Sequence, residues 1–189
     1  MANLYLFRHG ETTHNQNKLF TGWYNETEFT SLGLLQNQHL ANLLKTTRLD
    51  LAFQTSLKRS QETLKTVLQY HPECTDLRTD DQLIERNYGI LNNSPHADLI
   101  ASQGQAEFDR IHRGWEDKLE GGESFVDVGA RVWEFIHQLK ADFASKDQNI
   151  AISAHGNSLR LFRHIMENST PEVTCSWVIP FATVFVYRI

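Results

Sequence analysis

Cysteine and long apolar runs are the two features that this sequence most plainly lacks. Its two cysteines, Cys74 and Cys175, lie far apart, so neither a disulfide framework nor a cysteine-based zinc motif is indicated. We therefore expect a reducing, cytoplasmic environment. No stretch approaches the ~20 apolar residues of a membrane-spanning helix, and no charged leader precedes the first apolar run. We expect a soluble, unprocessed protein with no membrane partner.

The sequence also lacks an excess of positive charge. It has 18 Lys and Arg against 23 Asp and Glu, a formal net charge of -5, and no basic run. This balance gives no support for a nucleic-acid partner, and an anionic substrate would need a local cationic pocket. With 189 residues, 40% of them hydrophobic, the chain can bury one good core, so we predict a single domain over residues 1–189. The sequence is compatible with a homo-oligomer as well as with a monomer.

Short apolar runs alternate with helical periodicity along the chain. Strands are predicted at 3–7, 50–54, 149–153 and 182–187, and the first three have the continuous apolar character of a covered sheet. Helices with one apolar face are predicted between them and after the third strand. The residues of these faces are Leu32, Leu35, His39, Leu40, Leu43 and Leu44; Leu57, Leu64, Val67 and Leu68; and Val128, Val132, Phe135, Ile136 and Leu139, with a fourth helix at 158–166. This order predicts an α/β fold, a three-layer α/β/α sandwich with a mostly parallel central sheet.

Two histidines directly follow predicted core strands. Arg8-His9-Gly10 comes after the first strand, and His155-Gly156 comes after the strand at 149–153. In an open α/β sheet, ligands bind beyond the carboxyl ends of the strands. Each glycine allows a tight turn beside a ligand, and the helix that begins near Asn157 would direct free amide groups at an anion. We therefore expect an anion site at this edge.

Several blocks of sequence carry a resemblance to a known family. They are Arg8-His9-Gly10-Glu11-Thr12, Phe20-Thr21-Gly22-Trp23, Thr55-Ser56-Leu57-Lys58-Arg59-Ser60, Glu85-Arg86-Asn87-Tyr88-Gly89, Gly122-Glu123-Ser124 and Ala154-His155-Gly156-Asn157-Ser158-Leu159-Arg160. The chain resembles the histidine phosphatase superfamily and, within it, the cofactor-dependent phosphoglycerate mutases. One Arg-His-Gly triplet is weak evidence, whereas ordered blocks over nearly the whole chain are specific. The resemblance implies phosphoryl transfer on a small phosphorylated metabolite through a phosphohistidine, with no metal and with 2,3-bisphosphoglycerate as a phosphoryl primer.

Phosphoryl transfer needs an in-line nucleophile and fixed positive charge around the phosphate oxygens. By resemblance the nucleophile is His9, and a neutral imidazole suits this role because the unperturbed pKa of His is ~6.5. Arg8 and Arg59 would grip the phosphate with planar forks that Lys cannot match. His155 and Asn15 would add hydrogen-bond donors.

The leaving alkoxide must gain a proton, and the acceptor must later lose one. A carboxylic acid can do both, and Glu85 matches the acid/base position of the family. The family's substrate-contacting positions are matched by Thr21, Gly22, Tyr88 and Asn157.

Simpler interpretations exist for these residues when each is taken alone. A His beside a strand is usually structural, and paired histidines can bind a metal, although neither block offers a further ligand at metal spacing. Arg59 could cap or pair on a helix surface, and Glu85 could pair with Arg86 as a solvated charge. Their occurrence together in the family's order favours the phosphate site.

Residues 80–123 are less regular than their surroundings, and we predict that they form a small cap insertion beside the site. Aligned with the mutases, His96 falls on a lysine, while His112 and Arg113 fall on a pair of arginines that grip the far end of the substrate. We therefore predict that these three residues bind substrate. If both histidines titrate near ~6.5, phosphoglycerate should bind more tightly as the pH falls.

Two departures from the mutases favour hydrolysis instead. The sequence stops at Ile189, without the tail that covers the mutase site, so water would enter more easily. A Phe also stands at position 181, where the mutases carry Thr. Because the cap block is altered rather than absent, the sequence favours interconversion of 3- and 2-phosphoglycerate over hydrolysis of small phosphomonoesters. A catalytically silent anion-binding protein is a third interpretation, which the presence of His9, Glu85 and His155 disfavours.

Overall fold

A computed structural model describes all 189 residues as five strands and eight α-helices. The strands are β1 (Asn3–Arg8), β2 (Leu51–Gln54), β3 (Asp76–Thr79), β4 (Asn149–Ala154) and β5 (Val184–Arg188). The helices are α1 (Thr13–Gln16), α2 (Ser31–Leu44), α3 (Lys58–Leu68), α4 (His96–Gln103), α5 (Gln105–Arg113), α6 (Phe125–Phe143), α7 (Gly156–Glu167) and α8 (Pro171–Ser176), with 3₁₀ turns η1 (Asp81–Leu83) and η2 (Gly89–Leu91).

The sheet has the strand order β3-β2-β4-β1-β5, and β5 alone runs antiparallel, at one edge. The predicted mostly parallel α/β sheet is therefore confirmed. β1 and β4 pair from Asn3↔Asn149 to Arg8↔Ala154, so their carboxyl ends lie level at the centre of the sheet. β3 was not predicted, because all four of its residues are exposed and two are charged, which leaves no apolar run to mark it.

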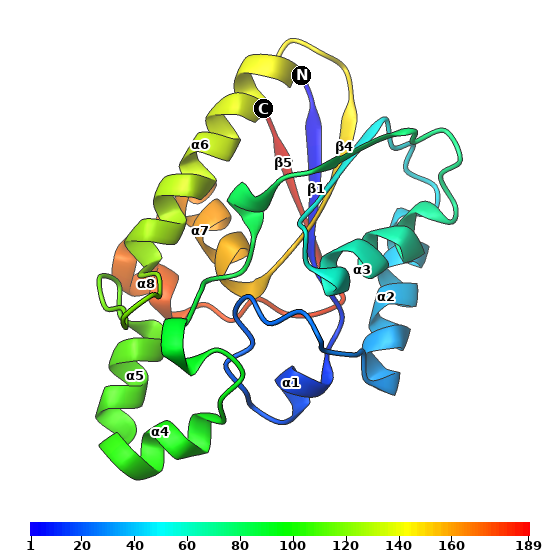
Figure 1. Ribbon diagram of the computed structural model, residues 1–189. Helices are drawn as coiled ribbons and strands as arrows, with labels where there is room; N and C mark the ends of the chain where they lie inside the picture. Colours follow the sequence, from blue (N-terminus) through cyan, green and yellow to red (C-terminus); the bar gives the residue numbers. More distant parts are fainter.

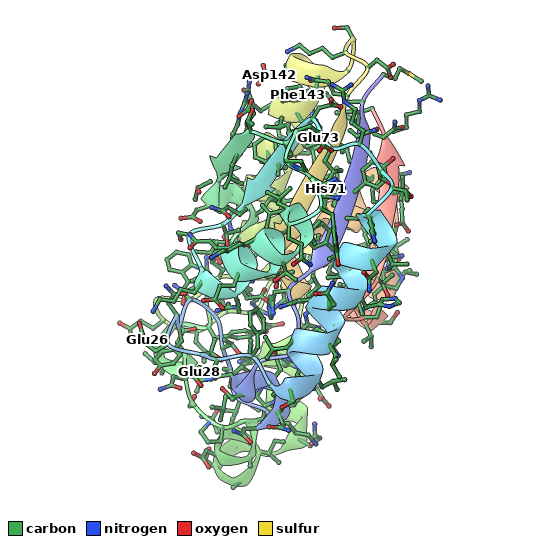
Figure 2. All side chains as sticks on the ribbon, turned by 90° about the vertical axis from the view of Figure 1, so that its right-hand side faces the viewer. Glu26, Glu28, His71, Glu73, Asp142 and Phe143 are labelled. Carbon is green, nitrogen blue, oxygen red and sulfur yellow. The ribbon has the colours of Figure 1, made fainter.

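Helices cover both faces of the sheet, α2 and α3 on one side and α6 and α7 on the other (Figure 1). Leu6 and Ile152 point toward α6, whose five predicted core residues are all buried. Phe7 and Ala151 point to the opposite side, where they join the cluster under α2 and α3. Figure 2 views the molecule from that side, with α2 in front of the sheet. None of the eight helices combines the length and apolar character needed to cross a lipid bilayer.

The apolar face predicted for the helix at 32–44 is confirmed in α2 only at Leu40 and Leu44. Leu32, Leu35 and Leu43 are 52%, 68% and 50% exposed. The buried residues of α2 are Gly33, Asn37, Leu40, Ala41 and Leu44. The reason is that α2 packs against the loop that follows β1, where Gly33 permits close approach and Asn37 accepts a hydrogen bond from the loop backbone at 2.9 Å. Contacts with this loop, rather than leucine spacing, decide which face turns inward.

The segment 80–123 lies beyond the carboxyl ends of the parallel strands (Figure 1). It contains α4 and α5, which were not predicted, in addition to irregular backbone. A small apolar cluster of Phe20, Tyr88, Leu99 and Ile111 ties it to the loop after α1. This cluster holds the segment over the edge where β1 and β4 end.

Candidate active site

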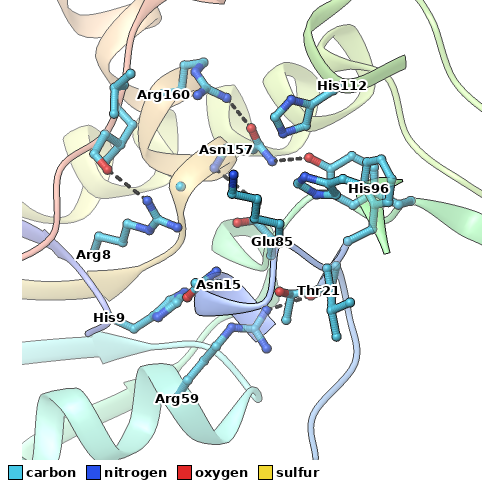
Figure 3. A pocket seen from close by; sticks show the side chains of 18 of the residues that line it. Arg8, His9, Asn15, Thr21, Arg59, Glu85, His96, His112, Asn157 and Arg160 are labelled. Carbon is cyan, nitrogen blue, oxygen red and sulfur yellow. Dashed lines mark hydrogen bonds between the residues drawn. The ribbon is translucent and has the colours of Figure 1, made fainter. Parts of the chain in front are cut away.

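A cavity of about 260 Å³ opens at the carboxyl ends of β1 and β4, under the segment 80–123 (Figure 3). Its wall includes five Lys or Arg side chains and one carboxylate, that of Glu85. The cationic residues are Arg8, Lys18, Arg59, Arg113 and Arg160. Positive charge is thus concentrated in one place on a chain whose formal charge is -5. Such a cavity attracts anions.

The register of β1 and β4 places His9 beside His155, with ring centroids 5.2 Å apart. Nδ1 of His9 lies 2.7 Å from the carbonyl oxygen of Gly10, which can only accept, so Nδ1 carries the proton and Nε2 keeps a free lone pair. Burial, followed by the charges of Arg59 and Arg8, holds the pKa of His9 well below its usual 6.5. His9 is therefore a neutral imidazole with an available nitrogen at neutral pH.

His155 is fully buried directly before α7. Its Nε2 lies 2.8 Å from Oγ1 of Thr55, and its Nδ1 has no protein partner. Burial and the charge of Arg59 hold its pKa well below the usual value. No cluster of three or more His, Cys, Asp or Glu side chains with metal-binding geometry occurs in the protein.

Arg59 is buried and Arg8 is partly buried, and backbone carbonyls hold both cations. Arg59 donates to two carbonyls of the 21–24 loop at 2.8 and 2.7 Å, while Arg8 donates to the carbonyl of Ile179 at 2.9 Å and lies 4.0 Å over the ring of Phe181. The Nε of each arginine is buried without a partner and is free to bind an anion. Burial lowers both pKa values, that of Arg59 to about 10, which leaves both side chains charged near neutrality.

Glu85 is only 8% exposed, and its Oε1 accepts hydrogen bonds from the backbone N–H groups of Arg86 at 2.8 Å and Asn157 at 3.1 Å. The side chain of Asn157 in turn donates to the hydroxyl of Tyr88 at 3.1 Å. The indole of Trp23 donates to the Glu85 carbonyl at 2.7 Å. Glu85 is thus fixed in the cavity wall, which contradicts the alternative of a solvated surface charge.

The loop after β1 adds neutral groups to the wall. Oδ1 of Asn15 accepts from the backbone N–H and the hydroxyl of Thr12 at 3.1 and 3.0 Å, which leaves the amide nitrogen without a protein partner. The hydroxyl of Thr21 is buried and also unpartnered. Gly22 has φ 46°, and a Cβ there would overlap the side chain of Asn92. Only glycine fits this turn.

His96 and His112 line the cavity within an aromatic cluster, with their ring centroids 5.2 Å apart. The ring centroid of Phe20 lies 4.3 Å from that of His96, and the ring centroid of Phe108 lies 4.9 Å from that of His112. Burial lowers the pKa of His96 and, with the charge of Arg113, lowers that of His112 to about 3. The expectation that both titrate near 6.5 is therefore wrong. The aromatic surroundings disfavour their charged forms.

Two cations of the wall, Arg160 and Lys18, were not assigned a role from the sequence, whereas Arg113 was predicted to bind substrate. Arg113 and Arg160 both donate to the carbonyl of Trp177, at 3.1 and 3.0 Å, so the two guanidinium groups converge. Arg160 follows Asn157 by three positions in α7, and this spacing places both on one side of the helix. Lys18 also lines the cavity, and no sequence pattern marks it.

The family model described as histidine phosphatase superfamily, branch 1, matches residues 4–187. This chain belongs to the histidine phosphatase superfamily. It is 31% identical over 189 residues to the 2,3-bisphosphoglycerate-dependent phosphoglycerate mutase of Methylorubrum populi, across 98% of this chain and 89% of that protein. It is 32% identical over 190 residues to the mutase of the same name from Brucella anthropi, across 98% and 91%.

A solved structure of the same fold is the α-ribazole phosphatase from Shigella flexneri. It has a TM-score of 0.82 and 27% identity, across 97% of this chain and 89% of that one. The resemblance drawn from the sequence blocks is thus confirmed. Within the histidine phosphatase superfamily, the chain is an enzyme of the mutase and phosphatase type.

Proposed function

We propose that this enzyme transfers the phosphoryl group of a small phosphorylated metabolite through a phosphohistidine at His9. The observation that carries the proposal is the state of His9, a neutral imidazole with its Nε2 lone pair free, beside the cations Arg8 and Arg59. A nucleophile fixed in one tautomer next to planar cationic forks suits in-line displacement at phosphorus.

In the first half-reaction, Nε2 of His9 forms a bond to phosphorus while the bond from phosphorus to the substrate oxygen breaks. The departing oxygen takes a proton from the carboxylic acid of Glu85. Arg8, Arg59 and His155 stabilise the charge on the equatorial oxygens. In the second half-reaction an acceptor oxygen attacks the phosphohistidine and returns its proton to Glu85, which restores His9.

For the acceptor, we propose a hydroxyl of bound phosphoglycerate, as in interconversion of 3- and 2-phosphoglycerate. The relatives named as mutases at 31–32% identity support this choice, as do the five cationic side chains of the cavity. These cations also fit 2,3-bisphosphoglycerate, which would supply the phosphoryl group that first loads His9. Asn15, Thr21, Gly22, Tyr88, Gly156 and Asn157 would contact the substrate. The segment 80–123 would act as the cap of one domain.

Hydrolysis of small phosphomonoesters is the alternative. It is favoured by one feature of the cap, where His112 has a pKa of about 3 and so supplies no positive charge at the position where the mutases carry arginine. Weaker binding of the far end of the substrate would let the dephosphorylated acid leave the phosphoenzyme before the phosphoryl group is returned to it. The phosphohistidine would then react with water.

One assay separates the two reactions. Purified protein is incubated with 3-phosphoglycerate, with and without 2,3-bisphosphoglycerate, and both 2-phosphoglycerate and free phosphate are quantified. A mutase yields 2-phosphoglycerate in a primer-dependent manner, and a phosphatase yields phosphate. His9→Ala should abolish both products and the acid-labile protein-bound phosphate together. Turnover or label retained by His9→Ala would show that another residue is the nucleophile.

A further inference from the structure

The backbone that carries Glu85 has no helix or strand to hold it. Residues 84–87 lie between η1 and η2 in irregular conformation, and the carbonyl of Glu85 bonds to no backbone N–H. In Figure 3 the Glu85 side chain lies between His9 and His112. Its Oε1 accepts two backbone N–H groups, whereas its Oε2 has no protein partner and is free to serve the leaving oxygen. A misplacement of about 1 Å at a reacting group is costly in rate, so other contacts have to fix this segment.

Two side chains from distant parts of the chain hold the Glu85 carbonyl. The indole N–H of Trp23 donates to it at 2.7 Å, and the guanidinium of Arg131, on α6, donates to it at 3.2 Å. A carbonyl oxygen has two lone pairs, so these two donors satisfy it fully. Neither residue lines the active-site cavity; both line a separate hollow that includes Glu123. They therefore reach the site only through the backbone of Glu85.

Arg131 is itself held by a bidentate ion pair with Glu123. Its Nε and Nη2 donate to the two carboxylate oxygens at 2.9 and 3.1 Å, and its Nη1 donates to the carbonyl of Gln82 at 2.8 Å. Glu123 also accepts from the N–H of Asn87 at 2.8 Å, and its own N–H donates to the Asn87 carbonyl at 2.8 Å. The pair thus holds the segment before, at and after Glu85. A planar fork of this kind has a defined geometry.

Trp23 connects Glu85 to the cation that grips the phosphate. Arg59 donates to the carbonyls of Gly22 and Tyr24, the two neighbours of Trp23, at 2.7 and 2.8 Å. The residue between these two anchored carbonyls then bonds to the Glu85 backbone. The position of the carboxyl group is therefore set relative to Arg59 through a single residue.

We propose that Trp23 and Arg131 are positioning residues for proton transfer, which hold the carbonyl of Glu85 and so fix its carboxyl group relative to the phosphate at Arg59. This inference rests on the proposed function, because it takes Glu85 as the acid that protonates the leaving oxygen. Loss of either contact should slow the reaction only where the leaving group needs that proton.

The test uses two variants, each with a matched control. Trp23→Phe keeps an aromatic ring and removes the N–H donor. Its control is Trp133→Phe on α6, because Trp133 is 46% exposed against 45% for Trp23 and its indole forms no hydrogen bond. Arg131→Lys keeps the positive charge and loses the fork. Its control is Arg163→Lys, since Arg163 is similarly buried, is also paired with a glutamate and does not line the cavity.

The assay is kcat/KM for 3-phosphoglycerate, whose leaving group is an alkoxide, and for p-nitrophenyl phosphate. For 3-phosphoglycerate, 2-phosphoglycerate and free phosphate are counted together, so the choice of acceptor does not matter. Trp23→Phe should lose about fivefold to tenfold with 3-phosphoglycerate, and Arg131→Lys about tenfold or more. Both should stay within about twofold of the wild type with p-nitrophenyl phosphate, and both controls should do so with either substrate.

A second copy of each measurement in the Glu85→Gln background separates positioning from general damage to the fold. Without an acid to position, Trp23→Phe should cause no further loss beyond about twofold with 3-phosphoglycerate. An equal loss with both substrates, a loss that recurs in full in the Glu85→Gln background, or no loss at all would overturn the inference. Should Arg131→Lys fail to fold, Trp23→Phe decides alone.

Failure of the proposed function has a different signature. Glu85→Gln by itself would then lose equally with both substrates, which would remove the acid and the positioning role together. A selective loss in Glu85→Gln that is missing in Trp23→Phe would instead leave the acid in place and overturn the positioning role alone.

Discussion

Replacing Glu85 by Gln removes a titrating proton and keeps the size of the side chain. Oε1 of Glu85 accepts from the N–H groups of Arg86 and Asn157, and the amide oxygen of Gln can accept both. The free energy of unfolding should therefore fall by only about 1–2 kcal/mol, through lost charge assistance. The effect on catalysis should be larger. General acid help is typically worth ~10²–10⁴ in rate, or about 3–5 kcal/mol.

The assay is kcat/KM across phosphomonoesters whose leaving groups differ in basicity. Alkyl phosphates need a proton on the leaving oxygen, so Glu85→Gln should lose about 10²–10⁴-fold with them. The loss should shrink to about tenfold or less with p-nitrophenyl phosphate. Glu62→Gln, at an exposed site on α3, serves as the control. Equal losses for good and poor leaving groups would assign the proton to another residue.

Other outcomes follow from the same geometry. Because the pKa of His9 is held well below 6.5, the acid limb of kcat/KM for p-nitrophenyl phosphate should lie below pH 6.5, and a midpoint at or above it would contradict the neutral nucleophile. His9, His112 and His155 stay neutral in the fold but protonate in the unfolded chain, so urea denaturation should show the unfolding free energy falling by about 3–4 kcal/mol between pH 7 and 5.5. Arg59→Lys keeps the charge but loses the fork, and kcat/KM should drop about 10–100-fold; a change within twofold would refute bidentate gripping. Gly33→Ala, where a Cβ would overlap the loop after β1, should lower the unfolding free energy by about 2–3 kcal/mol, while Gly129→Ala in α6 has room and should not.

The sheet and the two histidines could be predicted because their signals are local. Apolar runs mark β1 and β4, and in parallel strands the residues that follow the last pair meet at one edge. His9 and His155 therefore needed no knowledge of tertiary packing to be placed at the same edge.

The inward face of α2 and the charge of the cap histidines depend instead on contacts with residues that lie far away in the sequence. Asn37 is buried because a loop N–H needs an acceptor there, which hydrophobic periodicity cannot reveal. Phe20 and Phe108, from two separate segments, surround His96 and His112 and keep them neutral. An alignment by position transfers residue types but not these surroundings. The place of Lys18 in the cavity wall also emerges only when the chain is folded.

The pairing of β1 with β4 makes the distance between the two histidines a property of strand register. Each residue lies one step beyond the last pair, Arg8↔Ala154, so no loop length enters that distance. Tolerance to insertions and deletions should therefore be uneven along the chain. An extra residue in the turn at 145–148 leaves the pair intact, whereas losing one residue inside β1 moves His9 to the opposite face of the sheet. Insertions and deletions should therefore be tolerated in the connecting segments but not within β1 or β4, because the pairing of these two strands sets the distance between His9 and His155.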